Sequence, residues 1–251
     1  MTDDHELAAQ VAYDAGQLLL KLRTTSDDPA ILKREGDAQA NVLILDALQR
    51  ARPDDPILSE ESADVSARLQ SSRVWIVDPL DGTREYSEKG RDDWAVHIAL
   101  VIDGVAAIGA VALPARDLVL RTDPAPVVPP RGDRPIRLVV SRTRPPAVTG
   151  LIQAALGADL LPMGSAGAKT MAIVLGAADV YAHSGGQYQW DSAAPVAVAR
   201  AAGLHTSRLD GSPLVYNDAD PYLPDLLVCR PELADQVLAA AREIPGSAGL
   251  E

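Results

Sequence analysis

The pattern of apolar and polar residues in the first half of the chain predicts two helices followed by a β-meander. Apolar side chains recur at helical spacing at positions 7, 11, 15, 18, 19 and 22, and again at positions 40, 43, 44, 47 and 48. Short apolar runs at residues 56–60 and 74–77 predict strands, and an acidic residue stands at the end of each run. Residues 94–102, 105–113 and 117–121 predict three further strands, and Asp103-Gly104 is a two-residue turn between the first two.

The second half of the chain alternates between strand and helix patterns. We expect strands at residues 136–141, 160–162, 178–183 and 226–229, and helices at residues 149–156, 166–175, 192–202 and 232–243. The five prolines within residues 123–135 exclude a helix or a central strand there, so this segment predicts a connector. The sequence therefore predicts a layered α+β or α/β fold, with an N-terminal part at residues 1–123 and a C-terminal part at residues 136–251.

Composition and charge narrow the classes of function. A net charge of −12 repels the phosphate backbone, so we expect no nucleic acid polymer as partner, and a small anionic substrate needs local cations at its site. No run reaches the roughly 18 apolar residues of a membrane helix, and the acidic start is unlike a secretory signal, so we expect a cytoplasmic protein without a membrane partner. Cys229 is the single cysteine, which excludes an internal disulfide and a thiolate zinc site. It lies in an apolar run and is expected in a buried strand.

The run Asp78-Pro79-Leu80-Asp81-Gly82-Thr83 carries the strongest indication of chemistry. Two carboxylates three residues apart follow an apolar strand, and such a cluster favours neutralisation by cations. Mg²⁺ takes oxygen ligands, which two aspartates and a backbone carbonyl supply. Gly82 and Thr83 can open a helix whose free N–H groups bind a phosphate. A turn with solvated acids is the alternative. The run does not match the Asp-x-Asp-Gly-Thr motif of haloacid-dehalogenase-type phosphatases, because its two aspartates are one residue further apart.

Two further acidic positions leave alternatives open. Glu60 and Glu61 follow Ser59 at the end of an expected strand, and adjacent glutamates often form a solvated face. Asp191 follows Trp190 where the N-cap of a helix is expected, so its role is either a cap or a metal ligand.

Together, these motifs resemble a lithium-sensitive, Mg²⁺-dependent phosphatase superfamily. It includes inositol monophosphatases, fructose-1,6-bisphosphatases and 3′-phosphoadenosine 5′-phosphate phosphatases. The resemblance covers most of the chain and rests on residues 59–61, 78–83 and 190–194 in that order. Residues 81–86, 164–169 and 186–191 are most similar to the bacterial branch that acts on 3′-phosphoadenosine 5′-phosphate. The resemblance implies an inositol-monophosphatase-like, alternating α-β-α-β-α sandwich.

The resemblance also implies roles for individual residues. Its metal ligands are Glu60, Asp78, the Leu80 carbonyl, Asp81 and Asp191, which would hold two or three Mg²⁺ ions at a site inhibited by Li⁺. Gly82 and Thr83 would hold the phosphate through backbone N–H groups, and Asp191 would also contact the substrate. Asp37 and Thr83 would activate the attacking water, with a helix cap as the alternative for Asp37.

The substrate pocket is expected around Ser165, Lys169 and His183. Lys169 is a candidate for a second phosphate, with a surface lysine as the alternative, whereas His183, Gln187 and Tyr188 are candidates for a base or sugar pocket. His97 is expected in the core or beside the site.

The leading functional hypothesis is a 3′(2′),5′-bisphosphate nucleotidase of sulfate assimilation. It would remove the 3′-phosphate of 3′-phosphoadenosine 5′-phosphate, and of the related phosphosulfate as a further candidate. The alternative is a broader phosphatase for inositol 1-phosphate or fructose 1,6-bisphosphate. Against inositol phosphate, Glu85 stands where inositol-specific members usually carry Asn. Because family members are often homodimers, a homodimer is the expected assembly.

Overall fold

Two five-stranded sheets organise the chain in the computed structural model, which describes residues 3–243. The first sheet has the order β1-β2-β3-β4-β5, with β1 parallel to β2 and the remaining pairs antiparallel. Its strands are β1 (Ile57–Ser59), β2 (Arg73–Asp81), β3 (Ala95–Ile102), β4 (Val105–Leu113) and β5 (Leu118–Arg121).

The second sheet has the order β7-β6-β8-β10-β9 and is mixed. Strand β6 runs parallel to β7 and β8, whereas β10 runs antiparallel to β8 and β9. Its strands are β6 (Arg137–Ser141), β7 (Asp159–Met163), β8 (Val180–Tyr188), β9 (His205–Ser207) and β10 (Tyr222–Cys229). Cys229 is buried at the end of β10, as predicted.

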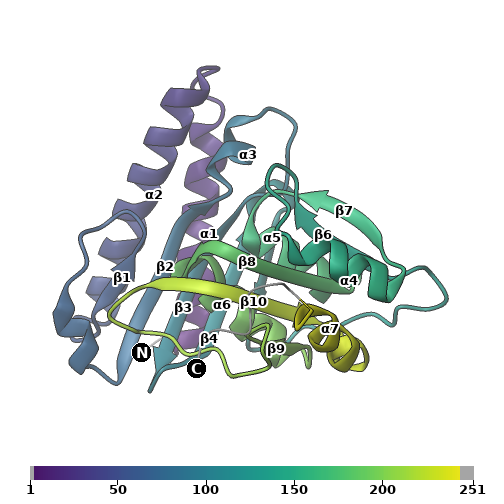
Figure 1. The fold of residues 1–251 in the computed structure, drawn as a ribbon. Helices are drawn as coiled ribbons and strands as arrows, with labels where there is room; N and C mark the ends of the chain where they lie inside the picture. The colour runs from purple at the N-terminus through teal and green to yellow at the C-terminus, as the bar shows by residue number, and fades with distance from the viewer. Residues whose placement is uncertain (1–2, 244–251) are drawn as a thin grey trace.

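Helices form three layers around these sheets (Figure 1). The pair α1 (Asp4–Leu22) and α2 (Pro29–Ala51) covers the outer face of the first sheet, and α5 (Ala166–Val174) and α6 (Gln189–Ala201) lie between the sheets. The pair α4 (Val148–Leu156) and α7 (Ala234–Ala241) packs on the outer face of the second sheet. The short helices are α3 (Thr83–Ser87), η1 (Ser66–Gln70), η2 (Pro114–Arg116) and η3 (Pro231–Leu233). The predicted layered α-β-α-β-α sandwich is therefore confirmed.

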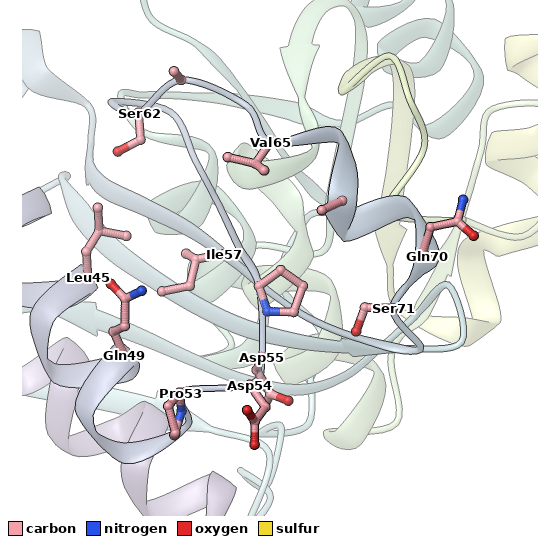
Figure 2. A pocket seen from close by; sticks show the side chains of 13 residues that line it. Leu45, Gln49, Pro53, Asp54, Asp55, Ile57, Ser62, Val65, Gln70 and Ser71 are labelled. Carbon is pink, nitrogen blue, oxygen red and sulfur yellow. The ribbon is translucent and has the colours of Figure 1, made fainter.

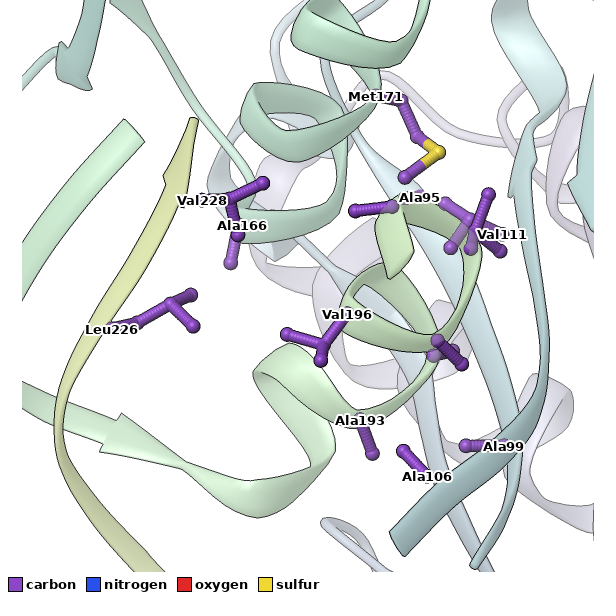
Figure 3. Packing of buried hydrophobic residues seen from close by; sticks show 14 of the residues in the cluster. Ala95, Ala99, Ala106, Val111, Ala166, Met171, Ala193, Val196, Leu226 and Val228 are labelled. Carbon is purple, nitrogen blue, oxygen red and sulfur yellow. The ribbon is translucent and has the colours of Figure 1, made fainter. Parts of the chain in front are cut away.

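Small side chains let the middle layer pack closely against both sheets. Figure 3 shows Ala193 and Val196 of α6 among residues of β3, β4 and β10. Gly109 of β4 faces the same helix, and a Cβ atom there would lie 2.6 Å from the Ala194 carbonyl oxygen. This close crossing fixes the position of α6, and with it the position of Asp191 in its first turn.

Three predicted boundaries were wrong in ways that concern the site. Strand β2 does not stop before Asp78 but continues to Asp81, because β3 pairs with it on both sides of a register shift between these residues. Helix α2 begins at Pro29, so Asp37 lies inside the helix and is not a cap. Helix α6 begins at Gln189, so Asp191 is in its first turn and Tyr188 is the N-cap. Strand β9 and helix η1 were not predicted, because their sequences show no clear apolar periodicity.

The proline-rich connector is fastened to the second sheet by a buried carboxylate. Asp179 is fully buried and accepts hydrogen bonds from Arg134 (2.5 Å) and Arg230 (2.7 Å). Arg230 also donates to the carbonyl of Pro129 at 2.7 Å. Among residues 3–243, no helix combines the length and the apolarity needed to cross a membrane.

Candidate active site

Strand β2 brings Asp78 and Asp81 to one buried site at its C-terminal end. Asp78 is 1% exposed and Asp81 is 7% exposed. Pro79 and Leu80 lie in the register shift between them, and the Leu80 N–H donates to Asp78 Oδ1 at 3.0 Å. Gly82 then adopts φ +84°, which lets the chain leave the strand and start α3 at Thr83, as the sequence predicted.

Helix α2 presents Asp37 to the start of α3. Gly36 makes this possible, because a Cβ atom there would lie 2.9 Å from side-chain atoms of both Leu80 and Tyr86. The Thr83 Oγ1 atom lies 3.4 Å from Asp37 Oδ1 and 3.1 Å from the Leu80 carbonyl oxygen, with the hydroxyl as donor. Burial, followed by the nearby charge of Glu61, raises the pKa of Asp37 to about 7.

Asp81 is held by groups from two other elements, helix α5 with its N-cap and strand β3. Its Oδ2 atom accepts hydrogen bonds from Ser165 Oγ at 2.6 Å and from the Gly167 N–H at 2.7 Å, and His97 Nε2 lies 3.2 Å away. His97 Nδ1 lies 3.1 Å from the Trp190 carbonyl oxygen. Burial opposes the charge of Asp81, but His97 and then Lys169 and Ser165 outweigh it and lower the pKa of Asp81 to about 2.

The other three predicted acidic ligands have pKa values shifted in the opposite direction. Burial and the charges of Glu60 and Asp81 raise the pKa of Asp78 well above its usual value. Burial is also the main cause at Glu60 and at Asp191, where repulsion by Asp81 adds to it and the pKa reaches about 7. Glu60 shares a hydrogen bond with Asp78, and Asp191 Oδ2 accepts the Tyr188 N–H at 2.7 Å. Each of Glu60, Asp78 and Asp191 feels the charge of Asp81, so these carboxylates lie near one another.

This donor set fits a hard divalent cation. Asp78, Asp81 and His97 each place a ligand-type atom within 4.8 Å of the others, the one such group of three found among the described residues. The His97 nitrogens face Asp81 and the Trp190 carbonyl, so we assign His97 to the support of Asp81 and not to the metal. Carboxylate and carbonyl oxygens remain, which is the ligand type that Mg²⁺ prefers.

The predicted substrate residues come from the second half of the chain, beside this centre. Ser165 is the N-cap of α5 and is buried, with its hydroxyl between Asp81 and the Ala168 N–H. Lys169 is 5% exposed and donates to the carbonyls of Gly164 and Ser165, so its surface alternative was wrong. None of these contacts tests the predicted substrate role of either residue.

His183 and Gln187 of β8 each leave a buried polar atom without a partner in the described structure. These atoms are His183 Nδ1 and Gln187 Oε1. The Gln187 amide donates to the Tyr181 hydroxyl at 2.8 Å, and Lys169 Nζ lies 5.2 Å from the centre of the Tyr181 ring. Burial lowers the pKa of His183. Gln187 Oε1 can therefore accept a hydrogen bond from a ligand, and so can His183 Nδ1, because His183 Nε2 donates to the Gly185 carbonyl oxygen.

Sequence reasoning missed two contributors, Gly167 and Asp93. Gly167 supplies an N–H to Asp81, and Asp93 Oδ2 accepts the Gly164 N–H at 2.6 Å. The run Gly164-Ser165-Ala166-Gly167 carried the signal, because glycines beside a helix start permit close backbone approach. The partner carboxylates are distant in sequence, so the pattern alone could not identify them.

A separate surface groove of about 610 Å³ contains none of the predicted site residues. Figure 2 shows that Leu45 and Gln49 of α2 line one side of it and Val65 and Gln70 line another. The candidate active site is therefore the carboxylate centre between the sheets and not this groove.

Comparisons with known proteins agree with this geometry. The model of the inositol monophosphatase family matches residues 6–123 and 136–245. The chain is 55% identical to a 3′-phosphoadenosine 5′-phosphate phosphatase of Mycobacterium tuberculosis, over 90% of this chain and 89% of that protein. It is 51% identical to the Mycobacterium leprae protein of the same name, over 96% and 94%. The 3′(2′),5′-bisphosphate nucleotidase CysQ of Escherichia coli K12 is 28% identical, over 85% and 94%.

Solved structures show the same fold. CysQ from Bacteroides thetaiotaomicron has a TM-score of 0.78 at 25% identity and covers 90% of this chain and 97% of its own. An inositol monophosphatase from Anabaena has a TM-score of 0.77 at 23% identity and covers 98% of each chain. The family match spans both halves of the chain and includes every predicted ligand. The chain therefore belongs to the inositol monophosphatase family.

Proposed function

We propose that this protein is a Mg²⁺-dependent phosphatase that hydrolyses the 3′-phosphate of 3′-phosphoadenosine 5′-phosphate, giving AMP and phosphate. The observation that carries this proposal is the buried carboxylate centre of Asp78 and Asp81 beside the Thr83–Asp37 pair. The substrate follows from relatives at 51% and 55% identity that are named for it. Sulfate assimilation is the proposed setting.

Glu60, Asp78, the Leu80 carbonyl, Asp81 and Asp191 are the proposed ligands of two or three Mg²⁺ ions, with Li⁺ as an inhibitor. Their mutual repulsion, seen in the raised pKa values of Glu60 and Asp191, supports this assignment. Bound Mg²⁺ supplies positive charge for the phosphoryl oxygens and increases the acidity of a nearby water. Without such cations, a protein of net charge −12 would repel a bisphosphate.

The chain's own groups orient the attacking water. When the Thr83 hydroxyl donates to Asp37, its oxygen lone pair can accept a proton-donating water, which directs the water's lone pair toward phosphorus. The Asp37 carboxyl, with its pKa raised to about 7, is suited to accept a proton relayed through Thr83 at neutral pH. The backbone N–H groups of Gly82 and Thr83 hold the phosphate oxygens. The phosphate leaves as product without a covalent enzyme intermediate.

The nucleoside part of the substrate is assigned to the β8 side of the site. His183 lies in the field of Lys169 and Arg144, which favours its neutral form, and its unpartnered buried Nδ1 suits a ribose hydroxyl as donor. Tyr188 is an exposed aromatic side chain three residues before Asp191 and can contact a base. Beyond the substrate, we propose a cytoplasmic homodimer that binds no nucleic acid polymer.

A substrate panel tests the proposal. Phosphate release is measured from 3′-phosphoadenosine 5′-phosphate, its phosphosulfate analogue, inositol 1-phosphate and fructose 1,6-bisphosphate, with and without Mg²⁺ and Li⁺. The bisphosphate nucleotide is expected to have the highest kcat/KM, with loss of activity in EDTA. A higher kcat/KM for inositol 1-phosphate would overturn the proposed substrate and leave the metal chemistry standing.

Two further measurements test the chemistry. In ¹⁸O-labelled water, a single turnover should place one ¹⁸O atom in phosphate, whereas a trapped phospho-aspartate would contradict direct attack by water. Asp81→Asn should lower kcat by several orders of magnitude while the circular dichroism spectrum is unchanged. Near-normal turnover of that variant would refute the metal assignment.

A further inference from the structure

The two oxygens of the Asp81 carboxylate have different surroundings. Oδ2 accepts the Ser165 hydroxyl at 2.6 Å and the Gly167 N–H at 2.7 Å, and His97 Nε2 is 3.2 Å away. None of residues 3–243 donates a hydrogen bond to Oδ1. One oxygen is therefore held by the second half of the chain, and the other is left for a cation.

The turn that holds Asp81 has an unusual backbone at Ser165. This residue has φ +49° and ψ 131°, a combination that an L-residue rarely adopts. Such a conformation persists only where surrounding contacts enforce it. The contacts at Ser165 are numerous: its hydroxyl joins Asp81 to the Ala168 N–H, and Asp93 accepts the N–H of the preceding Gly164 at 2.6 Å.

Lys169 closes this turn from the other side. Its Nζ donates to the Ser165 carbonyl at 2.7 Å and to the Gly164 carbonyl at 3.2 Å, and it lies 5.2 Å from the centre of the Tyr181 ring. Two of the three N–H groups of the ammonium therefore donate to this turn, and the ammonium also lies over the Tyr181 ring. With 5% of its surface exposed, Lys169 is enclosed by the protein, and its known hydrogen bonds all go to the turn that holds Asp81.

We propose that Ser165 and Lys169 are positioning residues for Asp81, which set the affinity of the site for Mg²⁺ and do not bind the second phosphate of the substrate. This inference rests on the proposed metal site. Lys169 holds the Gly164–Ser165 turn, the turn directs the Ser165 hydroxyl and the Gly167 N–H at Asp81 Oδ2, and Oδ1 is thereby oriented for the cation. A ligand from the first half of the chain becomes competent only when the second half is packed against it.

Gly167 is part of the same arrangement for a steric reason. A Cβ atom at this position would lie 2.0 Å from His97 Nε2, the other group that faces Asp81 Oδ2. The helix start can therefore approach the carboxylate only without a side chain. Hydrogen-bond partners of metal ligands typically change metal affinity by about 10–100-fold when they are removed.

The direction in which Mg²⁺ affinity changes in Lys169→Met distinguishes a positioning role from a purely electrostatic one. Removing a cation beside Asp81 reduces the repulsion of Mg²⁺, so Coulomb's law alone predicts tighter Mg²⁺ binding in Lys169→Met. Loss of the turn predicts weaker binding. Titration calorimetry of the full chain with Mg²⁺, in the absence of substrate, should show an increase in Kd of about tenfold or more. Tighter or unchanged binding would overturn the proposal.

Ser165→Gly keeps the test valid if Lys169→Met fails to fold. Glycine adopts a positive φ more readily than serine and is also a favoured N-cap, so the melting temperature in EDTA should change little, while loss of the hydroxyl should raise the Mg²⁺ Kd by about tenfold. Lys21→Met is the matched control, because Lys21 is an exposed lysine in the last turn of α1 and its loss should leave the Kd unchanged. An unchanged Mg²⁺ Kd in Ser165→Gly would refute the positioning role.

Kinetics at saturating Mg²⁺ provide a second discriminator. Both variants should keep KM for 3′-phosphoadenosine 5′-phosphate within about twofold of the unmodified protein, because the proposal places neither residue in contact with the substrate. An increase in KM for this bisphosphate but not for a nucleoside 3′-monophosphate would assign Lys169 to the second phosphate and overturn the inference. Since the calorimetric readout needs no substrate, it remains decisive even if the proposed substrate is wrong.

Discussion

Thr83 Oγ1 lies 3.4 Å from Asp37 Oδ1, although 46 residues separate them in the chain. Two glycines bring them together. Gly36 lets α2 approach Leu80 and Tyr86 closely, and Gly82, at φ +84°, turns the chain from β2 into α3. The pair is therefore built where a helix, a strand end and a short helix meet, beside the carboxylate centre.

Thr83→Ala and Asp37→Asn should each lower kcat by about 10²–10⁴-fold, because each removes one partner of the pair that orients the water. The double variant should lose little more than either single variant, since the two residues act as a unit. Thr83→Ser keeps the hydroxyl and is the matched control. Steady-state kinetics check this, and a change in KM with kcat unchanged would contradict the assignment.

The metal-free protein should lose stability as pH rises from about 5 to 8. Asp37, Glu60 and Asp191 have pKa values of about 7, above the ordinary values of 3.8, 4.5 and 3.8. The native state therefore binds more protons than the unfolded state in this range, and the free energy of unfolding falls as these groups ionise. Asp81 contributes no change there, because its lowered pKa of about 2 keeps it ionised throughout.

Bound Mg²⁺ should remove this pH dependence, since it favours the ionised carboxylates of the native state. Thermal unfolding at pH 5.5 and pH 8, in EDTA and in excess Mg²⁺, checks the expectation. Mg²⁺ should raise the melting temperature more at pH 8 than at pH 5.5. Equal stabilisation at the two pH values would show that these carboxylates do not hold the cation.

Gly167→Ala should destabilise the protein by about 1–3 kcal/mol, because the added methyl group would collide with His97 at the centre of the site. It should also weaken Mg²⁺ binding. Gly150→Ala is the matched control: it lies in α4 with no atom within 4 Å of its added Cβ, and alanine there should stabilise the helix by about 0.5–1 kcal/mol. Urea unfolding measures both. Similar effects of the two substitutions would argue against the close packing at Gly167.

Arg230→Met should destabilise the fold by about 3 kcal/mol, because it removes one of the partners of the fully buried Asp179. The connector would also lose its hydrogen bond at Pro129. For a chain of this size, the melting temperature should fall by about 6–12 °C. Calorimetric unfolding measures the fall, and the Mg²⁺ Kd should stay unchanged because Arg230 is not part of the site. A loss of Mg²⁺ affinity equal to that of Lys169→Met would contradict this separation.

Much of the site could be predicted because its chemistry is concentrated in short runs. The residues from Asp78 to Thr83 place two acids and a glycine after an apolar strand. Each of these features predicts structure or chemistry from its immediate neighbours alone. Lys169 shows the limit of this reasoning: its sequence neighbourhood is equally compatible with a surface lysine, a phosphate ligand or a buried clamp. Only the packing of α5 against β8 decides that its ammonium is enclosed by two carbonyls and the Tyr181 ring.

The sequence by itself determined the periodicities that form the helices and strands, the family, and the identities of the carboxylates, because these depend on residue types within a few positions of one another. The tertiary structure decided what those groups face. The sequence predicts a helix cap or a ligand at Asp191, and the crossing of α6 at Gly109 is what directs it toward Asp81. The sequence shows Asp81 as one acid of a pair, and only the fold shows that Ser165 and Gly167 hold one of its oxygens. Charge repulsion, burial and hydrogen-bond direction act through space, so they follow from the meeting of distant segments and not from any one of them.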